Sequence, residues 1–382
     1  MGRVKVNPKM LKWARVNSGY NHSNLPKRFQ DKYEKWESGE KLPTWKQLQD
    51  ISNTYKWPSA LFFRKNPPKS VIDSIELIEF RKFNPNMEES NSPKFNIGLR
   101  KAINKRNSFL ELIEDMNYPI PSFSRYQLDT KNVNELSSNI KKYLNVSLDE
   151  QKNWIYRNNS KTKDFEHYNF LNQWKEKISE LGVLIFEIPE VELYEMRALC
   201  IYYEKFPIIL LNGKDSVNAR IFSLIHELTH LILGESAICD LKSSEETLCN
   251  SVAGEILVPK KDLLKNNLLD NHDSYWEDSD LKKLSDIYGV SKEVILLRLL
   301  SLNKTTQEVY ELKKEEWSNL PLKKKESGGG DPVRTQVKYN GKLYSRVFLS
   351  AYQNNLIDGI ELYENLNIKL KHLDYLNDYL FE

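Results

Sequence analysis

The chain of 382 residues contains only three cysteines and no long apolar run. Cys200, Cys239 and Cys249 are irregularly spaced, which excludes the disulfide framework of a small secreted domain. A reducing cytoplasm is the simplest interpretation of this cysteine usage. No stretch approaches the roughly eighteen apolar residues of a membrane-spanning helix, and no apolar segment follows the first residues as in a secretory signal. We therefore expect a cytoplasmic protein without a membrane partner.

A strong excess of charge of either sign is also lacking, because the formal net charge is only +3. The charge is unevenly distributed, however, since residues 1–66 contain fourteen Lys and Arg against five Asp and Glu, a balance of +9. The rest of the chain therefore sums to −6. A basic segment on an acidic remainder indicates either a module that binds nucleic acid or a solvated basic surface without such a partner.

The length allows two or three domains, and the pattern of apolar residues divides the chain into four regions. Helical spacing dominates before residue 176, three strand-like apolar runs follow, and helical spacing then returns. This order predicts a mostly helical α+β fold. The regions are a compact helical unit at 1–68, a helical connecting region at 69–175, the strand-containing core at 176–320, and a small module at 331–382 that follows a Gly- and Lys-rich linker.

The core region combines short strands with two helices. A helix is predicted from about Ser216 to Leu233, because apolar residues recur on one face and Gly234 follows as a stop signal. A second helix is predicted from about Ser244 to Leu257, before Pro259. The strands are expected at residues 182–188, 198–203 and 207–211.

The first of these helices carries the segment His226-Glu227-Leu228-Thr229-His230. His226 and His230 are four residues apart, so their imidazoles lie on the same helix face and can ligate one Zn²⁺. Glu227 follows the first histidine and can reach a water beside the metal, as a general base for hydrolysis requires. The alternative is a buried helix with two hydrogen-bonded histidines, which gives no reason for a glutamate beside the first of them.

A catalytic zinc ion needs a third protein ligand and an open position. Glu246, in the second helix, lies sixteen positions after His230, enough for a loop and a returning helix. Because Ser243-x-x-Glu246 is also a capping box, spacing alone favours the ligand and the cap equally. Other candidates are Glu245, Cys249 and Glu255, whereas Asp215 and Glu235 are more typical of a cap and a surface residue.

Two longer motifs resemble those of the ImmA/IrrE metallo-endopeptidases. They are Arg220-Ile221-Phe222-Ser223-Leu224-Ile225-His226-Glu227-Leu228-Thr229-His230 and Glu246-x-x-Cys249-Asn250-x-Val252-Ala253-x-x-Ile256-Leu257-x-Pro259. In the family, the glutamate that opens the second motif is the third zinc ligand, so the resemblance favours Glu246 over the capping box. It implies a zincin-like core, in which a small sheet packs on the HExxH helix, and Zn²⁺ as cofactor. Cys249 and Val252 depart from the family pattern, where Ala and Phe are usual, without changing the metal chemistry.

Residues 1–68 resemble the Xre-like helix-turn-helix domain of the longer family members, which implies contact with DNA. The similarity is carried by Trp13-Ala14-Arg15 and by Trp36-Glu37-x-Gly39-x-x-x-Pro43-Thr44-x-x-Gln47-Leu48. The stretch from Gly19 to Trp36, however, is a few residues short for two full helices and a turn, and it contains Pro26. A helical docking module without DNA contacts is therefore the alternative.

The resemblance implies a zinc-dependent endopeptidase that cleaves a transcriptional repressor or regulator, in a stress response or a mobile element. Glu227 is then the catalytic residue, and His226, His230 and Glu246 hold the metal. The strand Ile208–Leu211, which precedes the catalytic helix, is predicted to align an extended peptide by edge pairing. The alternative is a DNA-binding regulator, or an antitoxin-like protein with a toxin-like partner, in which the metal site is structural or sensory.

Overall fold

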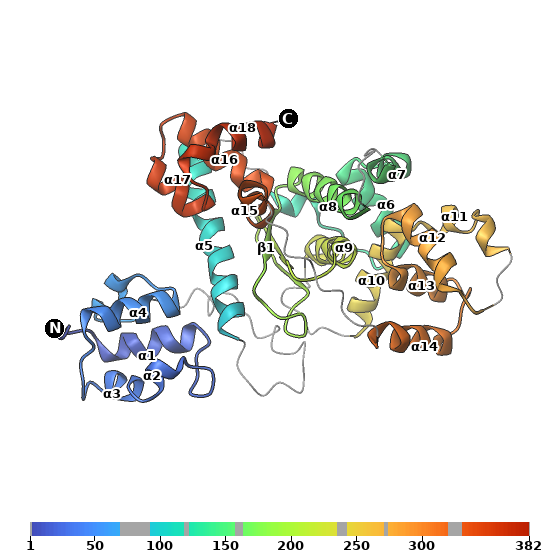
Figure 1. Ribbon diagram of the computed structural model, residues 1–382. Coiled ribbons are helices and arrows are strands. Elements are labelled where there is room, and N and C mark those ends of the chain that lie inside the picture. Colours follow the sequence, from blue (N-terminus) through green and yellow to red (C-terminus); the bar gives the residue numbers. More distant parts are fainter. Residues whose placement is uncertain are drawn as a thin grey trace. The chain divides into compact units, whose positions relative to one another are not determined.

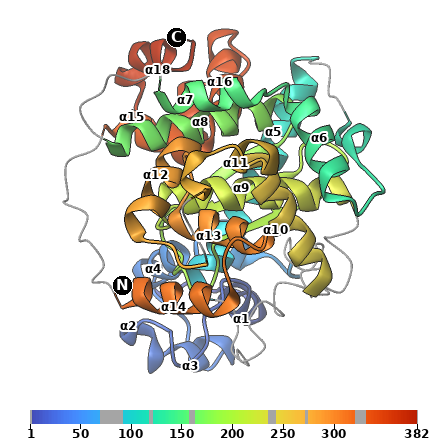
Figure 2. The same ribbon diagram turned by 90° about the vertical axis from the view of Figure 1, so that its right-hand side faces the viewer.

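The computed structural model describes residues 2–68, 92–117, 122–156, 163–234, 243–270, 274–319 and 331–381. These residues form many helices and one three-stranded sheet (Figures 1 and 2), which confirms the expected mostly helical α+β class. The chain divides into two compact units, the first with residues 1–105 and 190–195, the second with residues 106–189 and 196–382. No described helix is both long and apolar enough to cross a membrane.

The first unit begins with four helices in chain order. The first and fourth are capped, and the second and third are very short. Asn7 caps the first helix, and Thr44 and Gln47 form a capping box at the start of the fourth. The two helices between them have only four and five residues. The stretch from Gly19 to Trp36 therefore has room only for short helices, as its residue count predicted. The four helices are α1 (Pro8–Asn17), α2 (Lys27–Gln30), α3 (Tyr33–Glu37) and α4 (Trp45–Tyr55), followed by a 3-10 turn at Ser59–Phe63.

Helix α5 (Pro93–Asp115) begins in the first unit and continues into the second. Its Arg100 is buried, and the guanidinium carbon lies 3.8 Å from the ring centroid of Trp57. The guanidinium also donates to the carbonyl oxygens of Tyr55 and Lys56, each at 2.8 Å. Burial lowers the pKa of Arg100 to about 10, so the side chain remains charged at neutral pH. These contacts attach the start of α5 to the end of α4.

The sheet of the second unit consists of β1 (Leu184–Ile188), β2 (Ala198–Ile201) and β3 (Ile208–Asn212), in the order β1-β3-β2. β1 pairs with β3 in parallel and β2 pairs with it antiparallel. The expectation that Ile208–Leu211 offers an edge to a peptide is therefore wrong, because β3 is the central strand and is paired on both sides. Chain order placed this strand next to the helix that carries His226 and His230, but strand order depends on long-range pairing.

Helices cover both faces of this sheet. On one face, Ile209 and Leu211 of β3 share a buried cluster with Leu224 of helix α9 (Val217–Leu233), and α8 (Lys163–Glu180) packs beside α9. On the other face, Tyr344 of the C-terminal helices lies edge-on to Phe186 of β1 and is stacked with Phe109 of α5. Figure 1 shows β1 between these two groups of helices.

The C-terminal helices approach the sheet closely at Gly341. This residue has a φ of +78°, and a Cβ there would lie 2.5 Å from the carbonyl oxygen of Ile185. A larger residue would therefore push α15 and α16 away from β1. The C-terminal helices are α15 (Pro332–Asn340), α16 (Lys342–Gln353), α17 (Gly359–Leu366) and α18 (Leu373–Phe381).

The remaining helices surround α9. Among them, α12 and α13 pack against each other, and half of the ten residues of α13 are buried, including Ile295 and Leu299. This burial favours structural packing over contact with DNA. The helices are α6 (Val133–Leu144), α7 (Leu148–Tyr156), α10 (Ser243–Leu257), α11 (Lys260–Leu263), α12 (Asp278–Tyr288), α13 (Lys292–Ser301) and α14 (Gln307–Ser318).

Candidate metal centre

Helix α9 supplies two of the candidate ligands from a fixed position in the core. Ser216 caps the helix by accepting a hydrogen bond from the amide of Ala219, and Gly234 ends it with a φ of +70°. The apolar face of the helix packs into the main buried cluster of the second unit. His226 and His230 are themselves buried, with 9% and 5% of their surfaces exposed. The helix therefore holds both imidazoles in one place.

Helix α10 packs against α9 and brings a carboxylate to the two imidazoles. The Nε2 atoms of His226 and His230 lie 3.1 Å apart. The carboxylate of Glu246 places Oε2 3.2 Å from Nε2 of His226 and Oε1 3.3 Å from Nε2 of His230. A group of at least three His, Cys, Asp or Glu residues whose ligand atoms all lie within 4.8 Å of one another could hold a metal ion. In the described part of the chain, His226, His230 and Glu246 form the one such group.

This donor set fits a zinc ion. For ligand atoms about 2.0–2.1 Å from tetrahedral zinc, the edge of the tetrahedron is about 3.3–3.4 Å. The three closest separations, 3.1–3.3 Å, are near that value. Two imidazole nitrogens and one carboxylate that converge on one point also repel each other unless a proton or a cation lies between them. Two histidines and a glutamate are a donor set of catalytic zinc sites that leaves one position open.

The charge of Glu246 dominates the electrostatics of the group. Hydrogen bonds from His226 and His230 hold the pKa of the Glu246 carboxyl well below its usual range. Burial acts to lower the pKa of His226, but its hydrogen bond to Glu246 and the charges of Glu227 and Glu246 outweigh burial and raise it. The site therefore attracts positive charge, and protons compete with a metal ion for it.

The other candidate ligands are engaged elsewhere or lie outside the group. Glu255 pairs with Arg298 and accepts from the amide of Lys260. Asp215 accepts a hydrogen bond from the amide of Ser216, but Ser216 itself caps α9, so the expectation of Asp215 as the cap is wrong. Cys249 is buried, and burial raises the pKa of its thiol. Glu235 lies outside the described residues, and Glu245 is not part of the group.

Glu227 lies one position after the first histidine and is also buried, with 8% of its surface exposed. Burial and the charge of this carboxylate raise the pKa of the Cys200 thiol on β2. The sequence analysis did not single out Cys200. Side chains alternate between the two faces of a strand. On β2, Ala198 and Cys200 face α9, whereas Leu199 and Ile201 are buried on the opposite face, so this alternation could have placed Cys200 near the site.

A hydrogen bond also links Asn250 to His226. Asn250 lies four residues after Glu246 on α10, so the two side chains share one face of that helix. Nδ1 of His226 is buried without a hydrogen-bond partner, so Asn250 does not fix the tautomer of the ring through that atom. The second motif of the sequence contains Asn250, but spacing alone did not assign it a partner.

Comparison with known proteins identifies the region that carries this geometry. Residues 178–300 match the family model of the IrrE N-terminal-like domain, Peptidase_M78. The match begins before β1 and ends within α13, so it contains the sheet, α9 and α10. It supports the resemblance to the ImmA/IrrE family and points to a metallopeptidase. No curated protein and no solved structure matches the chain.

A buried charge cluster lies at the start of α9. Arg220 donates from Nη1 to Glu187 of β1 at 2.7 Å, and both side chains are fully buried. Lys175 of α8 contacts the other carboxylate oxygen of Glu187. Nζ of Lys338, on α15, lies 3.7 Å from the oxygen that Arg220 contacts. The nearby cations hold the pKa of Glu187 below its usual range although burial opposes them. The carboxylate of Glu187 on β1 thus links α9 to α8 and to the C-terminal helices.

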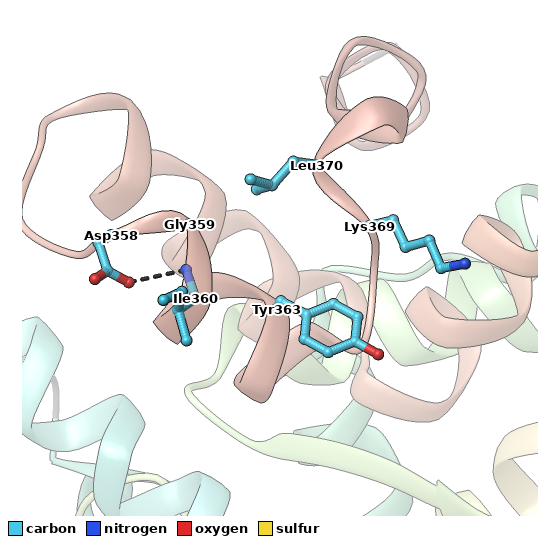
Figure 3. A pocket seen from close by; sticks show the side chains of 6 residues that line it. All are labelled: Asp358, Gly359, Ile360, Tyr363, Lys369 and Leu370. Atoms are coloured by element: carbon cyan, nitrogen blue, oxygen red, sulfur yellow. Dashed lines mark hydrogen bonds between the residues drawn. The ribbon is translucent and has the colours of Figure 1, made fainter.

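A separate hollow lies among the C-terminal helices (Figure 3). It is lined by Asp358, Gly359, Ile360, Tyr363, Lys369 and Leu370. Its one carboxylate, Asp358, accepts from the backbone amides of Ile360 and Glu361 and so caps α17. The lining contains no histidine, no cysteine and no second carboxylate, so the metal centre is the better candidate for chemistry.

Proposed function

We propose that the chain is a zinc-dependent endopeptidase. The observation that carries this proposal is that ligand atoms of His226, His230 and Glu246 lie within 4.8 Å of one another. A second glutamate, Glu227, is buried beside His226 on α9. The match of residues 178–300 to a peptidase family model supports the same reaction class. The donor set favours zinc over magnesium or calcium, which bind oxygen ligands.

Each residue of the site has a role in amide hydrolysis. His226, His230 and Glu246 would hold the ion, which when bound supplies Lewis acidity for the scissile carbonyl and for water. Glu227 accepts the proton of the attacking water and passes it to the leaving amine nitrogen. Its partly enclosed position excludes bulk water and keeps the carboxylate near the reacting atoms.

The edge of β2 is the place where we propose that the peptide binds. The amide of Asn212 donates to the carbonyl oxygen of Arg197, so this pair is hydrogen-bonded in the antiparallel ladder. In such a ladder the alternate residues, Ala198 and Cys200, direct their N–H and C=O groups away from β3. No strand of the described residues pairs with this side of β2. An extended peptide added here would lie next to α9.

The proposed substrate is a transcriptional repressor or regulator. The resemblance to the ImmA/IrrE family supports this class. A regulator that has an extended, accessible linker would suit an edge-strand site, because the scissile bond must enter as a single strand. Candidate substrates are the regulators whose genes lie beside the gene for this chain.

The test is cleavage of such a purified regulator by the zinc-loaded full chain. We expect discrete fragments, none with chelator, and none with Glu227→Gln, which keeps the shape of the side chain but cannot accept a proton. Glu180→Gln, an exposed carboxylate on α8, serves as the control and is expected to cleave normally. An intact regulator under every condition, with stoichiometric zinc present, would contradict the peptidase proposal.

The second candidate is a DNA-binding regulator or an antitoxin-like partner of a toxin-like protein. The balance of +9 in residues 1–66 supports contact with nucleic acid. The shortness of α2 and α3 argues against sequence-specific reading. A regulator would bind its own promoter DNA with a steep salt dependence and would keep that activity in Glu227→Gln.

A further inference from the structure

The C-terminal helices expose a cluster of apolar side chains to solvent. Ile360 of α17 is 70% exposed, Leu370 is 47% exposed and Tyr363 is 44% exposed. All three line the hollow of Figure 3, so they form one surface and are not scattered. Single exposed apolar residues are ordinary on a protein, but a cluster of them marks a place of contact with another molecule.

The residues behind this surface hold it in a fixed shape. Leu362 and Leu366, on the opposite face of α17, are fully buried, and α17 packs against α16. Ile368, which lies between α17 and Leu370 in the chain, is buried as well. A surface that is already ordered loses little conformational entropy when it binds. A partner can therefore dock here without a rearrangement of the C-terminal helices.

Opposite charges lie at the two ends of the surface. Figure 3 shows the carboxylate of Asp358 at one end and the ammonium of Lys369 at the other, with the three apolar side chains between them. The amides of Ile360 and Glu361 both donate to Oδ1 of Asp358, which leaves Oδ2 available to a cation. Within the part of the chain that the structure describes, no carboxylate forms an ion pair with Lys369. Both charges can therefore bind a partner.

The neighbouring residues repeat this division of charge. Both charged residues of α17, Glu361 and Glu364, are acidic, whereas the charged residues from 367 to 372 are Lys369 and Lys371. All four are exposed. The surface thus has an acidic side on α17, an apolar centre, and a basic side on the segment that follows.

We propose that this surface binds a second copy of the chain, in a two-fold dimer that covers Ile360, Tyr363 and Leu370. A two-fold axis through the apolar centre places the acidic side of each copy opposite the basic side of the other. Asp358 of each copy then meets Lys369 of the other, so the pair forms twice. A partner with charge of one sign would leave half of these groups unpaired, and a second copy therefore fits the surface better.

The dimer is expected to be weak and independent of the metal centre. Six residues line the hollow, whereas a stable interface has about 20–30 residues on each side. Exposed ion pairs contribute more to the choice of partner than to affinity. None of the lining residues belongs to the metal centre. The inference therefore does not rest on the proposed function, and a chelator should leave the dimer intact.

Sedimentation velocity of the full chain over about 1–100 µM tests for the dimer. We expect the mass to rise with concentration from 45.0 kDa toward twice that value. Ile360→Asp should weaken association by more than about tenfold, because it places a charge in the apolar centre. Leu264→Asp, at an exposed apolar residue outside the C-terminal helices, is the control and should associate as the wild type does. A wild-type chain that stays at 45.0 kDa, or a dimer that Ile360→Asp leaves unchanged, would overturn the proposal.

Exchanged charges test the two-fold arrangement itself. In Lys369→Glu each contact joins two acidic side chains, and in Asp358→Lys each joins two basic ones, so either variant alone should stay monomeric. An equimolar mixture should dimerise again, because both contacts then join opposite charges. A mixture of folded variants that stays monomeric would overturn the two-fold pairing.

The melting temperature identifies a folding defect in Asp358→Lys, which also removes the cap of α17. If that variant does not fold, Lys369→Glu alone still decides, because association as strong as that of the wild type would exclude the pairing. Lys142→Glu, on the exposed side of α6, is the matched charge control and should dimerise normally.

Discussion

The Nε2 atoms of His226 and His230 lie 3.1 Å apart, with ring centroids at 4.7 Å. A neutral imidazole offers one N–H and one lone pair, so two facing nitrogens share at most one proton. The carboxylate of Glu246 then adds negative charge at 3.2 and 3.3 Å from the same two atoms. The arrangement is stable only with positive charge at its centre, and a divalent cation supplies more of it than a proton.

Metal content follows directly from this relationship. We expect the purified chain to bind one zinc ion, and His226→Ala or Glu246→Gln to weaken zinc binding by more than about 100-fold, because each removes a ligand. Elemental analysis and titration with a zinc indicator measure the stoichiometry and affinity. Glu245→Gln, the adjacent carboxylate, is the matched control and should bind zinc normally. If zinc binding were lost in Glu245→Gln and normal in Glu246→Gln, then Glu245 and not Glu246 would be the ligand.

Sequence analysis predicted those parts of the site that depend on residues close together in the chain. The helix that carries His226 and His230 follows from apolar spacing and from Gly234, and the structure confirms it as α9 from Val217 to Leu233. The strand order was not predictable in this way. Pairing of β3 with both neighbours depends on contacts between distant segments, so the closeness of Ile208–Leu211 to α9 along the chain was misleading.

The C-terminal helices show the same limit more strongly. A linker composition separates residues 331–382 from the core, and this suggested an independent module. In the structure, Tyr344 and Gly341 pack against β1, and Lys338 reaches the carboxylate of Glu187. Neither the charge cluster nor the close approach has a local signature, because each partner is an ordinary lysine, glutamate or glycine until the fold brings them together.

The charge cluster makes Glu187 a strong test of that packing. Glu187→Gln removes the single carboxylate that neutralises Lys175 and Arg220, and we expect a loss of about 3–5 kcal/mol in the free energy of unfolding. Urea unfolding measures it. The control is Glu176→Gln, which breaks the more exposed pairs with Lys342 and Arg346 and should cost about 1 kcal/mol or less. Similar costs for the two variants would contradict the proposed importance of the buried pair.

Lys141 provides the last prediction, which concerns pH. Burial lowers the pKa of this lysine on α6 to about 8, against the opposing charge of Asp262. Between about pH 8 and the unfolded value near 10.5, the unfolded chain binds more protons than the folded one, so stability from this group rises with pH. Below pH 8 both states are charged, and the folded state carries the full cost of burying the charge.

Replacing Lys141 by methionine removes that cost and keeps most of the side-chain volume. We expect Lys141→Met to raise the free energy of unfolding by about 1–2 kcal/mol at pH 7, and the gain to shrink steadily between pH 8 and 10.5. Urea unfolding at a series of pH values, compared with the wild type, measures the difference. The neighbouring exposed residue supplies the control, because Lys142→Met should change stability little at any pH. A gain that persists unchanged at pH 10.5 would mean that methionine stabilises by packing and that the lysine is not charged at a cost in the folded state.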